Sequence, residues 1–229
     1  MLPYQVLIFD FDGTLCATQD SILYTFQKTF EHQGVTPPGE QQVKEGISTG
    51  ANLWEMLPLL HPPLREEEKH AELAEWVHLY RTIYDTDGGR LTTLFDGAEP
   101  LLKNLKELGL ACAVISNKGQ QAIEDALLKF NLRPYFDLVI GDNPALPLKK
   151  KPHPMAFHQV IQPHYPQAKN NQFLMVGDTH ADLEFANNAG IASCWATFGY
   201  GNTALCHKAN PTFAIDRLPQ LLPLLNPDG

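Results

Sequence analysis

Two aspartates, Asp10 and Asp12, follow an apolar run near the start of the chain. In an extended strand, residues two apart project from the same face, while Phe9 and Phe11 project from the other. Two unpaired carboxylates on one face repel each other, so a purely structural turn gains nothing from Asp10. The pair instead favours a site for a divalent cation or a phosphoryl group. A tight turn at Asp12-Gly13 is the alternative, because Asp-Gly is a common hairpin signal.

Polar residues also follow three later apolar segments: Ser116 and Asn117, then Lys151, then Asp178 with Asp182. Each group has a simpler interpretation, as a helix cap, as a solvated lysine loop, or as a cap and a surface acid. In an open parallel sheet, however, the carboxyl ends of the strands meet at one edge, where ligands bind. Because four strand ends carry complementary polar groups at once, we expect these side chains to form one site.

The segments that position these residues alternate between helices and short apolar strands from about residue 91 onward. This rhythm predicts an α/β fold with a doubly wound, mostly parallel sheet covered on both faces. The expected strands are residues 6–12, 110–116, 136–142, 171–178, 191–198 and 212–216.

The region between the first and second strands has helical periodicity throughout. We expect helices over residues 21–34, 39–47, 51–60 and 65–85, which together form a small bundle. The predicted architecture is therefore an α/β core, residues 1–15 and 90–229, with an all-helical cap inserted as residues 16–89.

Composition narrows the class of protein. The chain has 229 residues, of which 44% are hydrophobic, so it can bury a substantial core. Its net charge of -9 argues against binding to nucleic acid or to an anionic membrane surface. The four cysteines show no metal-ligand or CxxC spacing, and the N-terminal segment does not resemble a signal peptide. We therefore expect a cytoplasmic protein. For its oligomeric state, both a monomer and a homodimer stay open.

Four segments in order, DFDGTL, Ser116-Asn117, Lys151-Pro152 and GDTHAD, resemble the signature motifs of the haloacid dehalogenase superfamily. The inserted helices and the segments ISTGANL, KKKPHP and FGYG resemble its phosphoglycolate phosphatase-like branch, although Ser48 stands where that branch has a glycine. The resemblance implies a Rossmann-like core and a Mg²⁺-dependent phosphatase of small phosphorylated metabolites. It makes 2-phosphoglycolate the leading candidate substrate.

The residue types support a division of labour at the site. Asp10 at a rigid strand end can attack phosphorus and form an aspartyl phosphate. Asp12 can protonate the leaving oxygen and then accept a proton from water. Ser116 and Lys151 would hold the phosphoryl oxygens, and Asn117 is a further candidate for substrate binding.

The expected metal ligands are the carboxylates of Asp10 and Asp178, and the family resemblance adds the backbone carbonyl of Asp12. Asp182 is expected to orient the metal surroundings or Lys151. Thr14 is a candidate for substrate binding or for a hydrogen bond within its own loop.

The cap offers weaker signals. Ser48, Thr49 and Asn52 are candidates for contact with the leaving group, with helix capping as their alternative.

Two other functions use a similar set of residues. A sugar phosphomutase of the same superfamily would keep the phosphoaspartate until the product rebinds. A phospho-acceptor signalling module of the response-regulator type also uses acids, a Ser or Thr and a Lys on a doubly wound sheet, but a large helical insertion would have no role there.

Overall fold

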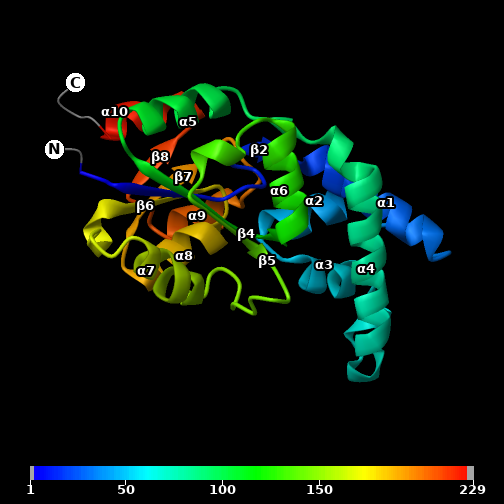
Figure 1. Cartoon of the computed structure of the whole chain (residues 1–229). Coiled ribbons are helices and arrows are strands. Elements are labelled where there is room, and N and C mark those ends of the chain that lie inside the picture. Colours follow the sequence, from blue (N-terminus) through cyan, green and yellow to red (C-terminus); the bar gives the residue numbers. More distant parts are fainter. Residues whose placement is uncertain (1–2, 226–229) are drawn as a thin grey trace.

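The computed structural model describes residues 3–225 and contains a six-stranded parallel sheet beside a lobe of helices (Figure 1). The strand order is β5-β4-β1-β6-β7-β8. β1 lies in the centre, with Phe9 in register with Val114 of β4 and with Val176 of β6. The strands are β1 (Val6–Phe9), β4 (Ala111–Gly119), β5 (Leu138–Asp142), β6 (Phe173–Gly177), β7 (Ala192–Ala196) and β8 (Phe213–Ile215).

Helices cover both faces of this sheet because alternate strand residues project to opposite sides. Leu7 and Phe9 of β1 pack in the hydrophobic cluster under α5, α6 and α10, whereas Val6 and Ile8 pack in the cluster with the α7 region and α8. In Figure 1, α5 and α10 lie above the sheet and α7 and α8 below it. The core helices are α5 (Ala98–Glu107), α6 (Gln120–Lys129), α7 (Gln162–His164), α8 (His180–Ala189), α9 (Thr203–Lys208) and α10 (Leu221–Leu225).

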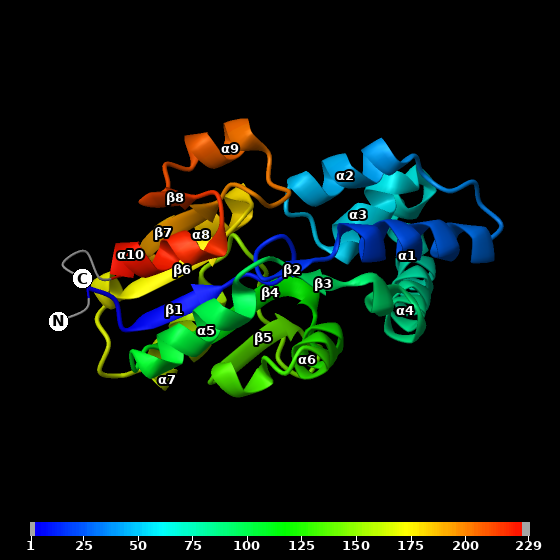
Figure 2. The same ribbon diagram turned by 90° about the horizontal axis from the view of Figure 1, so that it is seen from above.

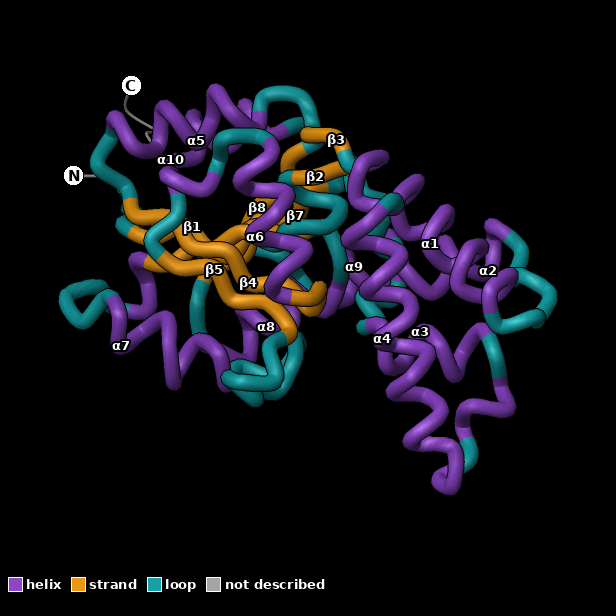
Figure 3. Tube along the Cα trace, turned by 45° about the vertical axis from the view of Figure 1, so that its right-hand side comes forward, coloured by secondary structure: helices purple, strands orange, loops and turns teal. Residues whose placement is uncertain are grey.

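The lobe consists of four helices with a hydrophobic cluster of their own, beyond the carboxyl ends of the strands (Figure 2). The helices are α1 (Gln19–His32), α2 (Glu40–Ser48), α3 (Leu53–Leu60) and α4 (His70–Thr86). A two-stranded antiparallel ribbon, β2 (Cys16–Ala17) and β3 (Thr93–Leu94), lies where the chain enters and leaves the lobe (Figure 3). The predicted fold class is confirmed; the domain limits at residues 15/16 and 89/90 stay a prediction.

Three local features differ from the expectation drawn from the sequence. The first strand, β1, ends at Phe9 rather than at residue 12, so Asp10 and Asp12 follow the strand instead of lying within it. The segment 153–162 has the residue pattern of an ordinary helix, but the structure contains a π-helical turn there, Phe157–Ile161, before the short α7. The helix α9 was not expected at all, because its six residues are too few to show a clear period. The alternative interpretation of Ser116 and Asn117 as helix caps does not hold, because Gly119 is the N-cap of α6 and β4 continues to it. Within residues 3–225, no helix has the length and apolarity to cross a bilayer.

Candidate active site

The carboxyl ends of the central strands open into a cavity of about 140 Å³ between the sheet and the cap. Asp10 and Asp12 follow β1, Asp178 follows β6, and Ser116 lies near the end of β4; all four line the cavity. Lys151, from the loop after β5, lines it as well. The structure thus brings together the polar groups that the sequence places after separate strands.

Lys151 is the buried cation at the centre of this site. Its Nζ lies 2.6 Å from Asp10 Oδ1 and 2.5 Å from Asp182 Oδ1, and it donates to the Ile115 carbonyl at 3.0 Å. Burial alone lowers the pKa of Lys151, but the two carboxylates outweigh burial and raise it. The lysine is therefore charged and has all three N–H donors engaged.

Three buried carboxylates, from Asp10, Asp178 and Asp182, have oxygen atoms within 4.8 Å of one another. Burial raises the pKa of Asp10 and of Asp178, and the neighbouring carboxylates raise both further. Charge of one sign is thus concentrated where little water can solvate it. A cluster of hard oxygen donors with excess negative charge fits a divalent cation such as Mg²⁺.

The chain holds Asp178 in place from several directions. Its Oδ2 accepts a hydrogen bond from the Tyr200 backbone N–H at 2.7 Å, and its Oδ1 accepts one from the Thr14 hydroxyl at 3.3 Å. The Trp195 indole N–H donates to its backbone carbonyl at 3.1 Å. Gly13 has φ +78°, and a Cβ atom there would overlap the Asp178 carboxylate, so the close approach requires glycine.

Asp12 faces a second buried cation, Lys118, whose Nζ lies 3.1 Å from Asp12 Oδ1. The same ammonium lies 4.0 Å from the centroid of the Tyr84 ring, which α4 of the cap contributes. Burial lowers the pKa of Lys118, but Asp12 and Tyr84 outweigh burial and raise it. A charged lysine therefore links the second aspartate of the pair to the cap.

Asn117 connects the strand end to the lysine loop. Its side-chain oxygen accepts from the Lys151 backbone N–H at 3.0 Å, and its amide nitrogen donates to the Lys151 carbonyl at 3.1 Å. The residue lines the cavity, but both ends of its amide hold the Lys151 backbone. Thr14 is fully buried against Asp178 and is not among the described residues that line the cavity. Contact of either residue with substrate stays a prediction.

The cap closes the cavity mainly with apolar side chains. Asn52 lines the cavity, and its side-chain oxygen caps α3 by accepting from Trp54 N–H at 2.9 Å. The Ser48 and Thr49 hydroxyls donate to carbonyls of their own helix, and neither residue lines the cavity. The apolar and aromatic lining residues from the cap are Ile22, Phe26, Ile47, Ala51, Leu53, Met56, Tyr80 and Tyr84.

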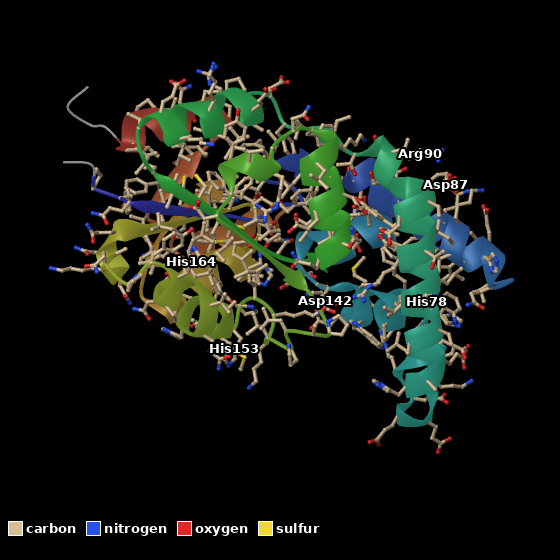
Figure 4. All side chains as sticks on the ribbon, viewed as in Figure 1. His78, Asp87, Arg90, Asp142, His153 and His164 are labelled. Carbon is tan, nitrogen blue, oxygen red and sulfur yellow. The ribbon has the colours of Figure 1, made fainter. Side chains whose placement is uncertain are left out.

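Three residues at this site had no role assigned from the sequence. Lys118 pairs with Asp12, Tyr200 binds Asp178, and Arg81 of α4 bridges to the core through Asp142. Figure 4 labels Asp142, which lies at the end of β5. The position of Lys118 directly after Ser116-Asn117 is the one available sequence signal. The partners of Tyr200 and Arg81 are 22 and 61 residues away, which local patterns do not reveal.

The comparisons with known proteins agree with this geometry. The profile of the haloacid dehalogenase-like hydrolases matches residues 7–196. A phosphoglycolate phosphatase from Vibrio cholerae is 30% identical over 223 residues, covering 97% of each chain. One from Neisseria meningitidis is 30% identical over 230 residues, covering 97% of this chain and 94% of that protein.

Among solved structures, a predicted phosphoglycolate phosphatase from Haemophilus somnus matches with a TM-score of 0.84 and 22% identity, over 98% of this chain and 99% of that one. This likeness shows the fold. The chain therefore belongs to the haloacid dehalogenase-like hydrolases, as a phosphatase enzyme of the phosphoglycolate phosphatase-like branch.

Proposed function

We propose that this enzyme is a Mg²⁺-dependent phosphatase of small phosphate esters that works through an aspartyl phosphate on Asp10, with 2-phosphoglycolate as the leading candidate substrate. The observation that carries the proposal is the buried contact of Lys151 with Asp10 and Asp182, beside Asp178. A cation fixed against a strand-end carboxylate supports nucleophilic attack on a phosphoryl group.

In the first step, a carboxylate oxygen of Asp10 attacks phosphorus and the bond from phosphorus to the leaving oxygen breaks. Asp12 gives its proton to that oxygen. Ser116 and Lys151 hold the phosphoryl oxygens, for which Lys151 gives up one of the three contacts that it makes in this structure, and its positive charge opposes the negative charge that develops on them. Lys151 also orients Asp10, since their atoms are 2.6 Å apart, and its charge opposes the rise that burial causes in the pKa of Asp10.

In the second step, water attacks the phosphorus of the aspartyl phosphate, Asp12 accepts a proton from that water, and the Asp10 carboxylate is released. Asp10, Asp178 and the backbone carbonyl of Asp12 are the proposed ligands of Mg²⁺. When bound, Mg²⁺ supplies positive charge against the phosphoryl oxygens. Asp182 acts through Lys151, which it contacts at 2.5 Å.

The substrate proposal rests on the relatives named phosphoglycolate phosphatase and on the cavity, whose volume of about 140 Å³ suits a small ester. The cap covers the site and would exclude bulk water during the reaction.

The test measures phosphate release from a panel of small phosphate esters that includes 2-phosphoglycolate, with Mg²⁺ or with a chelator. We expect Asp10→Asn to lower turnover by about 10³-fold or more, because the nucleophile is gone. Near-normal turnover in Asp10→Asn would refute the mechanism. Similar rates for all esters, lost in Asp10→Asn, would support the proposed mechanism and reject 2-phosphoglycolate as the preferred substrate.

A further inference from the structure

Two cationic side chains line the cavity without contacting Asp10, and the proposed phosphoryl chemistry uses neither. Lys118 comes from the end of β4 and Arg81 from α4 of the cap. Only 9% of the Lys118 side chain is exposed. Placing an ammonium ion in such a position costs solvation free energy, so a lysine here is expected to have a specific anionic partner.

The position of Lys118 follows from that of Asp12. If Asp12 protonates the leaving oxygen, that oxygen lies within hydrogen-bond distance of the Asp12 carboxylate. Lys118 Nζ lies 3.1 Å from the same carboxylate. A negative group one or two carbons from the leaving oxygen would therefore lie beside the ammonium. The contact with Asp12 does not use all the hydrogen-bond donors of Lys118, because an ammonium has three N–H donors.

Arg81 brings a second positive group to the same end of the cavity. A Cβ atom at Gly119, the residue after Lys118, would lie 3.8 Å from Arg81 Nε. One guanidinium nitrogen of Arg81, Nη2, contacts Asp142 Oδ2 at 2.5 Å, and Lys150 Nζ contacts the same oxygen at 2.9 Å. Within residues 3–225, Asp142 is the one side chain that Arg81 pairs with, so Nε and Nη1 keep free donors.

The remaining surface of the cap side leaves few other partners for an anion. Its lining is mostly apolar, and Asn52, whose side-chain oxygen caps α3, offers only the neutral N–H donors of its amide. One acidic side chain, Asp85, also lines this region. Burial and the neighbouring Asp125 carboxylate raise the pKa of Asp85, whereas the charges of Lys118 and Arg81 lower it.

We propose that Lys118 and Arg81 bind a carboxylate on the leaving group, so that the enzyme selects phosphate esters of short hydroxy acids. This inference rests on the proposed phosphatase function and deepens it, because it assigns the recognition of the organic part of the substrate to two named residues.

The test compares two esters that differ at one group: 2-phosphoglycolate and 2-hydroxyethyl phosphate, in which a hydroxymethyl group replaces the carboxylate. The quantity measured is the ratio of their kcat/KM values in the wild type, Lys118→Met and Arg81→Met. We expect the wild type to prefer 2-phosphoglycolate and Lys118→Met to lower the ratio about 10- to 100-fold, the effect of one charged hydrogen bond. Arg81→Met is expected to lower it less, because this side chain is already paired with Asp142.

The ratio separates substrate recognition from effects on Asp12, because any change in proton transfer slows both esters. Lys118→Arg, which keeps the charge, should retain part of the preference, and Lys103→Met on the exposed surface of α5 should retain all of it. Equal losses for the two esters in both test variants would overturn the proposal. If Lys118→Met is inactive, the ratio of the two kcat/KM values in Arg81→Met tests the proposal: a lower ratio than in the wild type supports it, and an unchanged ratio overturns it. A wild type that hydrolyses both esters without preference overturns the carboxylate site alone, whereas one that hydrolyses no phosphate ester overturns the proposed function as well.

Discussion

The core and the cap contribute different kinds of group to the same cavity. On the core side, Lys151 and Asp10 form a buried ion pair between residues 141 positions apart in the sequence. On the cap side, the Ser48 and Thr49 hydroxyls bond to carbonyls three residues away in their own helix, and most of the lining is apolar. The core thus fixes its charged groups by long-range contacts, whereas the cap supplies a mainly apolar cover whose Ser48 and Thr49 hydroxyls bond locally, with the Arg81 bridge to Asp142 as a long-range exception.

This difference separates the reaction from the choice of substrate. Groups that must stay in place while charge develops are best held by a rigid scaffold. A cover that must open for substrate and product has few strong bonds to the core. Changes in the core should therefore affect chemistry and stability together, and changes in the cap or at its junction should affect mainly substrate use.

The largest combined effect is expected from Lys151→Met. Removal of this cation leaves Asp10 and Asp182 buried and without their partner, which costs about 3 to 5 kcal/mol of unfolding free energy. Turnover should fall as well, because the phosphoryl oxygens lose a positive charge. Urea unfolding and phosphate release measure the two effects.

Lys149→Met is the matched control for Lys151→Met, because Lys149 is exposed in the same loop. It should change the unfolding free energy by less than about 0.5 kcal/mol. Comparable losses in the two variants would contradict the central role of the buried lysine.

The placement of Asp10, Ser116, Lys151 and Asp178 around one cavity could be predicted from the sequence, because parallel strands end at one edge of a sheet. The alternation of helices and apolar strands also predicted the fold class. The pattern could not predict the Lys118 pair with Asp12, which joins residues 106 positions apart.

Contacts between cap and core depend on how the two regions pack, and local sequence carries no signal for packing at that range. Arg81 lies on a helix whose periodicity indicates only that the helix is amphipathic. Its ion pair with Asp142 is therefore visible only in the folded structure. The π-helical turn at Phe157–Ile161 could not be predicted either, because the residue pattern there is that of an ordinary helix.

The effect of Mg²⁺ on the unfolding free energy should depend on pH, because both act on carboxylates of the core. Neither should affect the cap. Burial raises the pKa of Asp10 from the ordinary 3.8 to about 7, against the opposing effect of Lys151. Without metal, the folded state therefore holds this proton more tightly than the unfolded state, and the resulting stability is present at low pH and is lost as pH rises through about 7. Bound Mg²⁺ replaces the proton, so it should stabilise the protein more at pH 7.5 than at pH 5.

Thermal unfolding with and without MgCl₂ at the two pH values measures this effect. At a hundredfold excess over the dissociation constant, the gain at pH 7.5 should be about 2.7 kcal/mol. In Asp178→Asn the gain should shrink at both pH values, because one proposed ligand is lost. A gain that is independent of pH, or larger at pH 5, would contradict the assignment of Asp10 to the metal site.

The smallest effect is expected where the two regions meet, at Tyr200. Its phenol oxygen accepts hydrogen bonds from the backbone N–H groups of Thr18 at 2.7 Å and Gln19 at 3.1 Å, at the start of α1. Its own backbone N–H donates to Asp178. Tyr200→Phe removes the hydrogen bonds to the cap and keeps the backbone hydrogen bond to Asp178. By the loss of one oxygen atom it therefore tests the contact with the cap apart from the contact with the core.

We expect Tyr200→Phe to lower the unfolding free energy by about 1 kcal/mol, as for the loss of a helix cap. It should lower kcat/KM for the preferred ester several-fold, because the first cap helix loses its anchor to the core, and leave the Mg²⁺ dissociation constant unchanged. Tyr135→Phe is the control, because Tyr135 is not among the described residues that line the cavity. If Mg²⁺ affinity fell together with kcat/KM, the anchor of α1 would be part of the metal site, and the cap and core could not be treated as separate contributors to catalysis.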